Sequence, residues 1–201
     1  MNCEDCRLCW ERQHNIVGMK GKDTADIMFV GEAPGREEDE WGVPFVGQAG
    51  SILTTVIGSV GLTWENSCVV NAVRCRPANN RTPMWDEIVT CRKYLFRDIA
   101  EVNPILIVAL GRVALSALYG KDANLDRGEV YICMIEGISR QLIYTYHPAW
   151  VLYGKDEYEK DKRKAAIVHH LKKNKTIIES ILEPGGSCGP RQDYSDSDVP
   201  F

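Results

Sequence analysis

The stretch that decides the fold reads IMFVGEAPGREED and covers residues 27–39. Its first four residues are apolar and lie between Asp26 and Gly31, a pattern that predicts a short buried strand. The strand leads into a loop that is rich in glycine and proline. Ligands of open α/β sheets bind at the loops beyond the carboxyl ends of the strands. This loop is therefore the first candidate for a binding site.

Helical and strand-like segments alternate through the rest of the chain. Apolar spacing predicts helices over 48–60, 83–102, 113–119 and 155–180, and short apolar runs predict strands over 68–70, 105–110, 131–134 and 141–144. This alternation indicates a three-layer α/β/α sandwich with a mainly parallel central sheet. We expect one domain over 1–182 and a flexible acidic tail over 183–201, where Pro, Gly, Ser and Asp dominate.

Composition restricts the possible functions only loosely. The chain has 201 residues and a formal net charge of −4, so a DNA-binding enzyme of this composition must concentrate its Lys and Arg locally. No stretch approaches the roughly 18 apolar residues of a membrane helix, and the N-terminus has no apolar signal core. We therefore expect a cytoplasmic, intracellular protein in a reducing compartment. There, the eight cysteines favour metal or cluster binding over disulfides.

Five cysteines form the candidate metal site. Cys3 and Cys6 make a C-x-x-C pair at a polar terminus, Cys9 continues the same spacing, and Cys75 and Cys91 follow far downstream. Four thiolates hold either a zinc ion or a 4Fe–4S cluster, and the spacing alone leaves both open.

Several motifs recur in a fixed order along most of the chain, from the first cysteine to about residue 171. They are CxxCxL at 3–8, GEAPGREED at 31–39, PFVGQAG at 44–50, NxVRCRP at 71–77, NRTP at 80–83, RG at 127–128 and HPAWVL at 147–152. In this order and spacing they resemble the family 4 uracil-DNA glycosylases, the iron–sulfur branch of the uracil-DNA glycosylase superfamily. The resemblance implies a DNA-repair enzyme that flips deoxyuridine out of DNA, hydrolyses its N-glycosidic bond and leaves an abasic site.

The resemblance also implies a cofactor and a DNA-binding segment. The 4Fe–4S ligands would be Cys3, Cys6, Cys75 and Cys91, with Cys9 as an extra thiol beside the cluster. The segment between the last two ligands would form a local basic patch for phosphates, made of Arg74, Arg76, Arg81 and Arg92. From it we predict Arg76 and Arg81 as DNA-binding residues.

Three side chains are predicted to surround an extruded uracil. Phe45 would stack on the base. The Asn71 amide offers an acceptor for uracil N3–H and a donor for O4, and cytosine presents the opposite polarity. His147 would donate to uracil O2 and stabilise the departing anion. Each has a plain alternative: a core aromatic, a cap after a strand, and a His-Pro turn.

The remaining predicted site residues lie in the first loop and near residue 150. The small residues Ala33 and Pro34 would let the backbone approach the base. Glu32 or Glu38 would position the attacking water and favour the cationic sugar. Leu152 would wedge into the duplex where the base leaves.

The tail suggests a partner. Its end, DYSDSDVPF at 193–201, looks like the acidic tip of bacterial single-stranded-DNA-binding proteins. Asp196, Asp198, Pro200 and Phe201 would bind proteins that read such tips, or compete for the basic face of the enzyme itself, unless the tail only solubilises the chain. We otherwise expect a monomer. Two rival functions are a glycosylase for another deaminated base, such as hypoxanthine, and a non-catalytic, cluster- or zinc-bearing DNA-binding adaptor.

Overall fold

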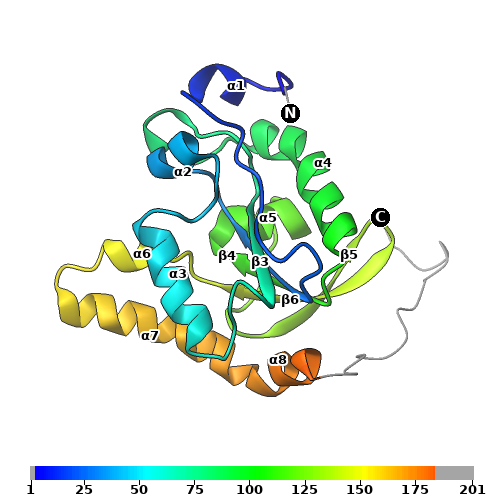
Figure 1. The fold of residues 1–201 in the computed structure, drawn as a ribbon, viewed down its shortest axis with the longest axis vertical. Helices are drawn as coiled ribbons and strands as arrows, with labels where there is room; N and C mark the ends of the chain where they lie inside the picture. Colours follow the sequence, from blue (N-terminus) through cyan, green and yellow to red (C-terminus); the bar gives the residue numbers. More distant parts are fainter. Residues whose placement is uncertain (1–2, 184–201) are drawn as a thin grey trace.

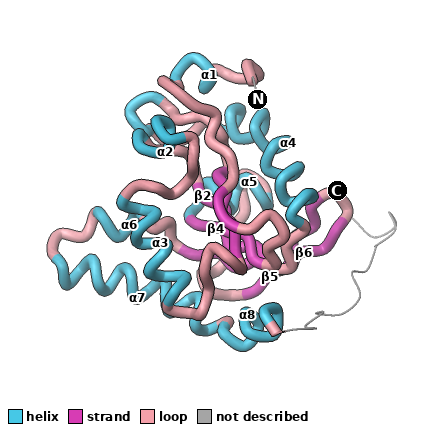
Figure 2. The backbone as a smooth tube through the Cα atoms, viewed as in Figure 1, coloured by secondary structure: helices cyan, strands magenta, loops and turns pink. Residues whose placement is uncertain are grey.

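A six-stranded sheet forms the centre of the molecule in the computed structural model, which describes residues 3–183 (Figure 2). In spatial order the strands are β1 (Lys20–Gly21), β3 (Ser67–Asn71), β2 (Ile27–Gly31), β4 (Leu106–Leu110), β6 (Ile138–Thr145) and β5 (Val130–Ile135). The four central strands are parallel, and the two edge strands are antiparallel to their neighbours. The predicted mainly parallel sheet is confirmed.

Helices cover both faces of this sheet because its central strands are apolar on both sides. The core on one face includes Phe29 and Val108 and packs on α3 (Gln48–Gly58), α7 (Glu157–Lys173) and α8 (Lys175–Leu182). The core on the other face includes Met28 and Ile107 and packs on α4 (Trp85–Val102) and α5 (Gly111–Tyr119). Figure 1 shows α3 and α7 on one side and α4 on the other. The α/β sandwich is therefore confirmed.

Short helices fill the connections that carry the motifs. They are α1 (Leu8–Glu11), α2 (Arg36–Trp41), the 3₁₀ turn η1 (Ala78–Asn80) and α6 (Ala149–Leu152). The prediction of a loop through 31–39 is wrong in its second half, which forms most of α2. Gly35 begins this helix, and its N–H donates to the Glu38 carboxylate at 3.0 Å. Acidic residues in the first turn also suit the positive end of the helix dipole, although they resemble a solvated loop in the sequence.

The single helix predicted over 155–180 is also wrong, because two helices meet at Asn174. The buried Asn174 amide donates to the carbonyl oxygens of Gly128 and His170, both at 2.9 Å. These bonds fix the chain at a bend between α7 and α8.

The described residues end one position after α8. The predicted tail residues Asp196, Asp198, Pro200 and Phe201 lie outside them. Between residues 3 and 183, no helix combines the length and apolar character needed to cross a membrane.

Candidate active site and cysteine cavity

A cleft of about 650 Å³ opens beyond the carboxyl ends of β2, β3 and β6. Parallel strands end at the same edge of a sheet, so residues that are far apart in the sequence meet there. The cleft is lined by nine of the predicted site residues: Glu32, Ala33, Pro34, Glu38, Phe45, Asn71, Arg81, His147 and Leu152.

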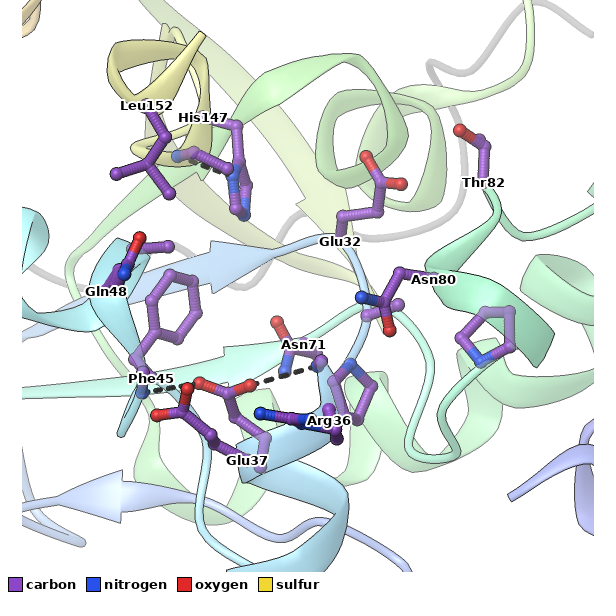
Figure 3. Close-up of a pocket in the computed structure, with 18 of the residues that line it drawn as sticks. Glu32, Arg36, Glu37, Phe45, Gln48, Asn71, Asn80, Thr82, His147 and Leu152 are labelled. Atoms are coloured by element: carbon purple, nitrogen blue, oxygen red, sulfur yellow. Dashed lines mark hydrogen bonds between the residues drawn. The ribbon is translucent and has the colours of Figure 1, made fainter. Parts of the chain in front are cut away.

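The three predicted base-contacting side chains converge on one space (Figure 3). The rings of Phe45 and His147 lie 5.7 Å apart between centroids, at an interplanar angle of 32°. Gly31 connects this pair to Asn71: a Cβ at Gly31 would lie 2.5 Å from Asn71 Oδ1 and 2.6 Å from Phe45 Cζ. Only glycine at this position leaves room for both side chains.

The loop that carries Phe45 has an unusual backbone. Phe45 has a φ of 55°, in the left-handed region that bulky residues rarely adopt. Glu38 fixes the residues that follow, because its Oε1 accepts the N–H groups of Val46 at 3.0 Å and Gly47 at 2.9 Å. The carbonyl of Phe45 packs on Gly50, where a Cβ would lie only 2.0 Å from the oxygen. The ring is therefore held in place before any ligand binds.

Asn71 and His147 both present polar atoms suited to a ligand. Asn71 is buried, and its Oδ1 has no hydrogen-bond partner within residues 3–183. Such an atom is costly unless a ligand completes its hydrogen bond. Burial lowers the pKa of His147 to about 4, so its ring is neutral at neutral pH. The Ala149 N–H donates to His147 Nδ1 at 3.1 Å, which places the single ring proton on Nε2.

The two candidate carboxylates have different surroundings. Burial raises the pKa of Glu32, and a hydrogen bond from the Thr82 hydroxyl partly offsets the effect. Both oxygens of Glu38 accept backbone N–H groups, since Oε2 takes that of Gly35. The fully buried Asp39 accepts the N–H groups of Gln13, His14 and Asn15 and thereby ties the N-terminal segment to α2.

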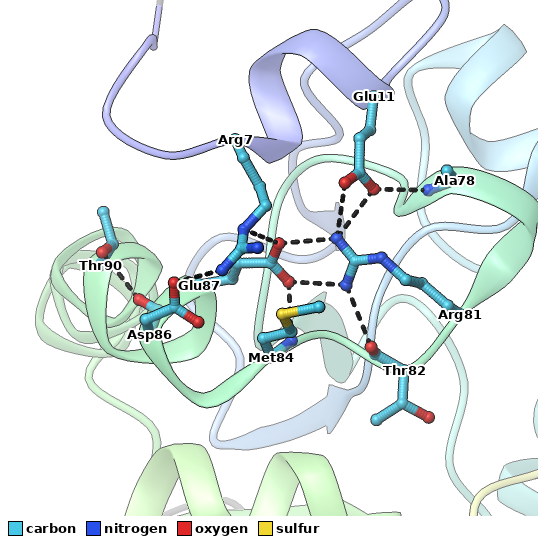
Figure 4. A network of polar contacts seen from close by, with 9 residues as sticks. All are labelled: Arg7, Glu11, Ala78, Arg81, Thr82, Met84, Asp86, Glu87 and Thr90. Atoms are coloured by element: carbon cyan, nitrogen blue, oxygen red, sulfur yellow. Dashed lines mark hydrogen bonds and ion pairs between the residues drawn. The ribbon is translucent and has the colours of Figure 1, made fainter.

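Arg81 lies at the cleft, but its charge is paired within the protein (Figure 4). Its guanidinium contacts Glu11 of α1 and the buried Glu87 of α4, each at 2.7 Å. Arg7 contacts Glu87 from the other side at 3.0 Å. This network joins α1, the loop before α4 and α4 itself.

Of the other three arginines in the predicted basic patch, the prediction is wrong for Arg74, whereas Arg76 and Arg92 form no ion pair within residues 3–183. Arg74 is buried and forms an ion pair with Asp98. Arg92 donates to the carbonyl of Ser116 at 3.1 Å and lies over aromatic rings. Arg76 is not among the residues that line the cleft, but its Nε donates at 2.7 Å to Oδ1 of Asn80, which does line it. Sequence shows where charges are but not which of them are already paired.

A second cavity collects the five predicted thiols, among apolar and aromatic neighbours. It is lined by Cys3, Cys6, Cys9, Cys75, Cys91, Leu8, Ile16 and Tyr94, among others. Burial raises the pKa of Cys6, Cys75 and Cys91, the last to about 12. Thiolates here thus require a cationic partner, and a metal ion or cluster supplies one.

The donor groups around these sulfur atoms suit an iron–sulfur cluster. The Arg74 N–H donates to Cys91 Sγ at 3.3 Å, and Arg12 donates to Cys75 Sγ at 3.6 Å. Hydrogen bonds of this kind to ligand sulfurs tune such clusters. Within residues 3–183, no group of three His, Cys, Asp or Glu side chains is arranged to hold a metal ion.

Several cleft residues received no role from the sequence, among them Gln48, Asn80 and Thr82. Gln48 begins α3, and Asn80 and Thr82 flank Arg81; all three line the cleft. Each stands inside one of the motifs at 44–50 and 80–83, so the motif boundaries were the available signal.

Comparison with known proteins agrees with this geometry. The family model for the uracil DNA glycosylase superfamily matches residues 19–172, which include β2, β3, β6 and the cleft between them. The chain therefore belongs to the uracil DNA glycosylase superfamily.

Within it, the chain is similar to type-4 uracil-DNA glycosylases. It is 38% identical to that of Saccharolobus solfataricus over 200 residues, which cover 94% of this chain and 91% of the relative. It is 39% identical to that of Archaeoglobus fulgidus, covering 82% of this chain and 86% of the relative. For the enzyme of Thermotoga maritima the identity is 36%, over 88% and 89%. The resemblance inferred from the motifs is confirmed.

Proposed function

We propose that this chain is a DNA-repair glycosylase that hydrolyses the N-glycosidic bond of deoxyuridine in DNA, releasing uracil and leaving an abasic site. The observation that carries this proposal is the convergence of a ring, an amide and a neutral imidazole on one cleft, from Phe45, Asn71 and His147. The names of its relatives support it. The duplex hides the target bond, so the nucleotide must be flipped into the cleft.

Asn71 selects uracil through the polarity of its amide. Its Oδ1, which has no partner within residues 3–183, accepts N3–H of uracil, and its Nδ2 donates to O4. Cytosine has no N3–H and presents a donor in place of O4, so both contacts fail. A site built for hydrogen bonds rejects a base that leaves buried groups unpaired.

His147 stabilises the departing base. Its neutral ring donates Nε2–H to uracil O2, where negative charge develops as the bond to C1′ breaks. Donors preset for a developing anion contribute about 2.7–4 kcal/mol to transition-state stabilisation. A neutral donor also releases the product anion more readily than a cation would.

We assign the water-positioning role to Glu32 and a positioning role to Glu38. Glu32 lines the cleft near Thr82, and its carboxylate can hold water against C1′ and favour the cationic sugar (Figure 3). Glu38 uses both oxygens to join two loops, which leaves it poorly placed to activate water. Ala33 and Pro34 form the wall that the base approaches.

We also propose a structural 4Fe–4S cluster, held by Cys3, Cys6, Cys75 and Cys91. When bound, it would supply cationic charge to buried thiolates and cross-link the segment before α1 to the loop and helix that follow β3. Reducing conditions preserve such thiolates, which agrees with a cytoplasmic location. The monomeric state stays a prediction.

For DNA contacts we propose Leu152 as the wedge and Arg76 as a phosphate contact. Leu152 is 37% exposed at the cleft rim. Within residues 3–183, Arg76 hydrogen-bonds the neutral side chains of Asn80 and Gln13 and forms no ion pair, so its charge is available to DNA. Arg81 is a weaker candidate because two carboxylates already neutralise it.

The acidic tail supports a proposal about partners. Its sequence suits binding of Phe201 and its carboxylate by a protein that has an apolar pocket beside a basic residue. Deleting Val199–Phe201 should remove such partners from a pull-down and leave uracil excision unchanged. Unchanged partners would contradict the proposal.

The central experiment is excision from labelled oligonucleotides that contain uracil, hypoxanthine or cytosine, followed by alkaline cleavage of abasic sites. Wild-type protein should cleave at uracil only. Asn71→Asp should lose more than about 100-fold on uracil, and His147→Ala about 10²–10³-fold in kcat. The exposed His169→Ala serves as the matched control. DNA binding without excision would instead favour the adaptor, and excision of hypoxanthine the other deaminated base.

A further inference from the structure

Lys20 stands behind the loop that carries Phe45, in a position that no recognised motif includes. It belongs to the two-residue edge strand β1 and is half-buried. Its Nζ donates to the carbonyl oxygen of Phe45 at 3.3 Å and lies 4.9 Å from the centre of the Trp64 ring. Burial lowers the pKa of Lys20, and the nearby Glu38 opposes this shift. The ammonium therefore lies over an aromatic ring, donates to a carbonyl oxygen and experiences the negative charge of Glu38.

The backbone of Phe45 needs such support. A φ of 55° is strained for a bulky residue and persists only where the surrounding structure fixes it. Glu38 fixes the N–H groups that follow Phe45, whereas Gly50 only leaves room for its carbonyl. Lys20 is the side chain that bonds this carbonyl within the described residues.

We propose that Lys20 is a positioning residue for the uracil-stacking ring of Phe45. Its ammonium anchors the carbonyl oxygen and Glu38 anchors the following amides, so the strained peptide is held from both ends. The ring then stays between Gly31 and His147, ready to receive the base. The proposal rests on the role of Phe45 in the proposed glycosylase.

Three variants separate this role from a general effect of charge. Lys20→Met keeps the apolar stem and removes the donor, Lys20→Arg restores a donor, and Lys22→Met removes the exposed lysine two residues away. We expect Lys20→Met to lower kcat/KM on a uracil oligonucleotide about tenfold, the usual effect of losing a charged hydrogen bond. Lys20→Arg should recover most of it, and Lys22→Met should match wild type.

Hydrogen–deuterium exchange tests the anchor independently of activity. Lys20→Met should speed exchange at the amides of Val46 and Gly47, which are ordered by the same loop, whereas Lys22→Met should not. Unchanged exchange would overturn the proposal. If the wild-type protein excised no uracil, the proposed function would fail, yet exchange would still decide whether Lys20 orders the loop.

A double-mutant cycle with Phe45→Ala tests whether Lys20 acts through the ring. In the Phe45→Ala background, Lys20→Met should change kcat/KM by less than about twofold. An equal tenfold loss in both backgrounds would mean that Lys20 acts by another route, and it would also overturn the proposal. If Lys20→Met did not fold, Lys20→Gln would replace it in the cycle.

Discussion

The base cleft and the cysteine lobe, which comprises residues 3–11, residues 72–84 and the first half of α4, differ in how their polar groups are paired. In the lobe, charges are paired: Arg81 lies between Glu11 and the buried Glu87. In the cleft, the buried Asn71 Oδ1 lacks a partner within residues 3–183. Paired charges stabilise a fold, whereas an unpaired buried atom costs stability that a ligand regains. The paired charges of the lobe therefore stabilise the fold, whereas the unpaired atom of the cleft favours binding of a ligand.

One segment belongs to both regions. Arg81 directs its guanidinium into the lobe, while its neighbours Asn80 and Thr82 line the cleft. Thr82 in turn bonds Glu32, the proposed water-positioning residue. A cluster far from the reacting bond can thus support activity by fixing this wall of the cleft.

The largest expected effect comes from removing a ligand in the lobe. Cys91→Ser should reduce iron from about four atoms per chain to less than one and abolish the visible absorbance of the cluster. Because a structural metal site contributes directly to folding, the thermal midpoint should fall by more than roughly 10 °C. Iron analysis, absorbance and calorimetry measure these changes.

Cys9→Ser is the matched control, since Cys9 lines the same cavity but is not one of the four proposed ligands. It should retain its iron. Full iron in Cys91→Ser, or loss of iron only in Cys9→Ser, would show that the ligand set is wrong. Zinc in place of iron would contradict the cluster.

In the cleft, the burial of His147 should make stability depend on pH. Its pKa is about 4 in the folded state and about 6.5 when unfolded, so the unfolded state binds more protons between these values. Stability is therefore fully present above about pH 6.5 and is lost as pH falls towards 4. From pH 7 to pH 5 this group should remove about 2 kcal/mol from the free energy of unfolding.

Denaturant unfolding at both pH values measures this loss. His147→Gln should lose about 2 kcal/mol less than wild type over the interval, because glutamine does not titrate. The exposed His169→Gln should behave as wild type does. An identical pH loss in His147→Gln would mean that His147 titrates as an ordinary histidine.

Most elements that build the cleft could be predicted because each is encoded by local pattern. The apolar runs before Gly31 and Asn71 predicted β2 and β3, and the polar residues at the ends of these strands predicted the site. The single helix over 155–180 failed because its break depends on Asn174 reaching Gly128, 46 residues earlier. The spacing of apolar residues along the chain does not reveal a long-range contact of this kind.

The ion pairs could not be predicted from the sequence either. Arg81 and Glu11 lie 70 positions apart, so nothing local showed that this arginine is neutralised. Lys20 escaped notice because a two-residue strand has no detectable pattern and its partner, the Phe45 carbonyl, is backbone. The motifs thus identified the side chains that face the base, but not the residues that fix the position of those side chains.

Substitutions of Arg81 and Arg76 test whether one arginine stabilises the fold and the other binds DNA. Arg81→Gln should lower the free energy of unfolding by about 1–2 kcal/mol, since Glu87 keeps only Arg7 as a cationic partner. It should leave the salt dependence of DNA binding unchanged. Arg76→Gln should do the reverse: stability should stay within about 0.5 kcal/mol, and the slope of log Kd against log salt should fall by about 1. A reduced slope for Arg81→Gln would restore it as a phosphate contact.

The smallest expected effect lies at the rim of the cleft, where Leu152 is 37% exposed. If this side chain fills the gap that a flipped nucleotide leaves, it matters only where a base stack has to be opened. Leu152→Ala should therefore slow excision about fivefold in duplex DNA and leave single-stranded substrate unaffected. Tyr158→Ala, an exposed residue on α7, should change neither rate. Equal losses on both substrates would mean that Leu152 contacts the flipped base itself and does not act as a wedge in the duplex.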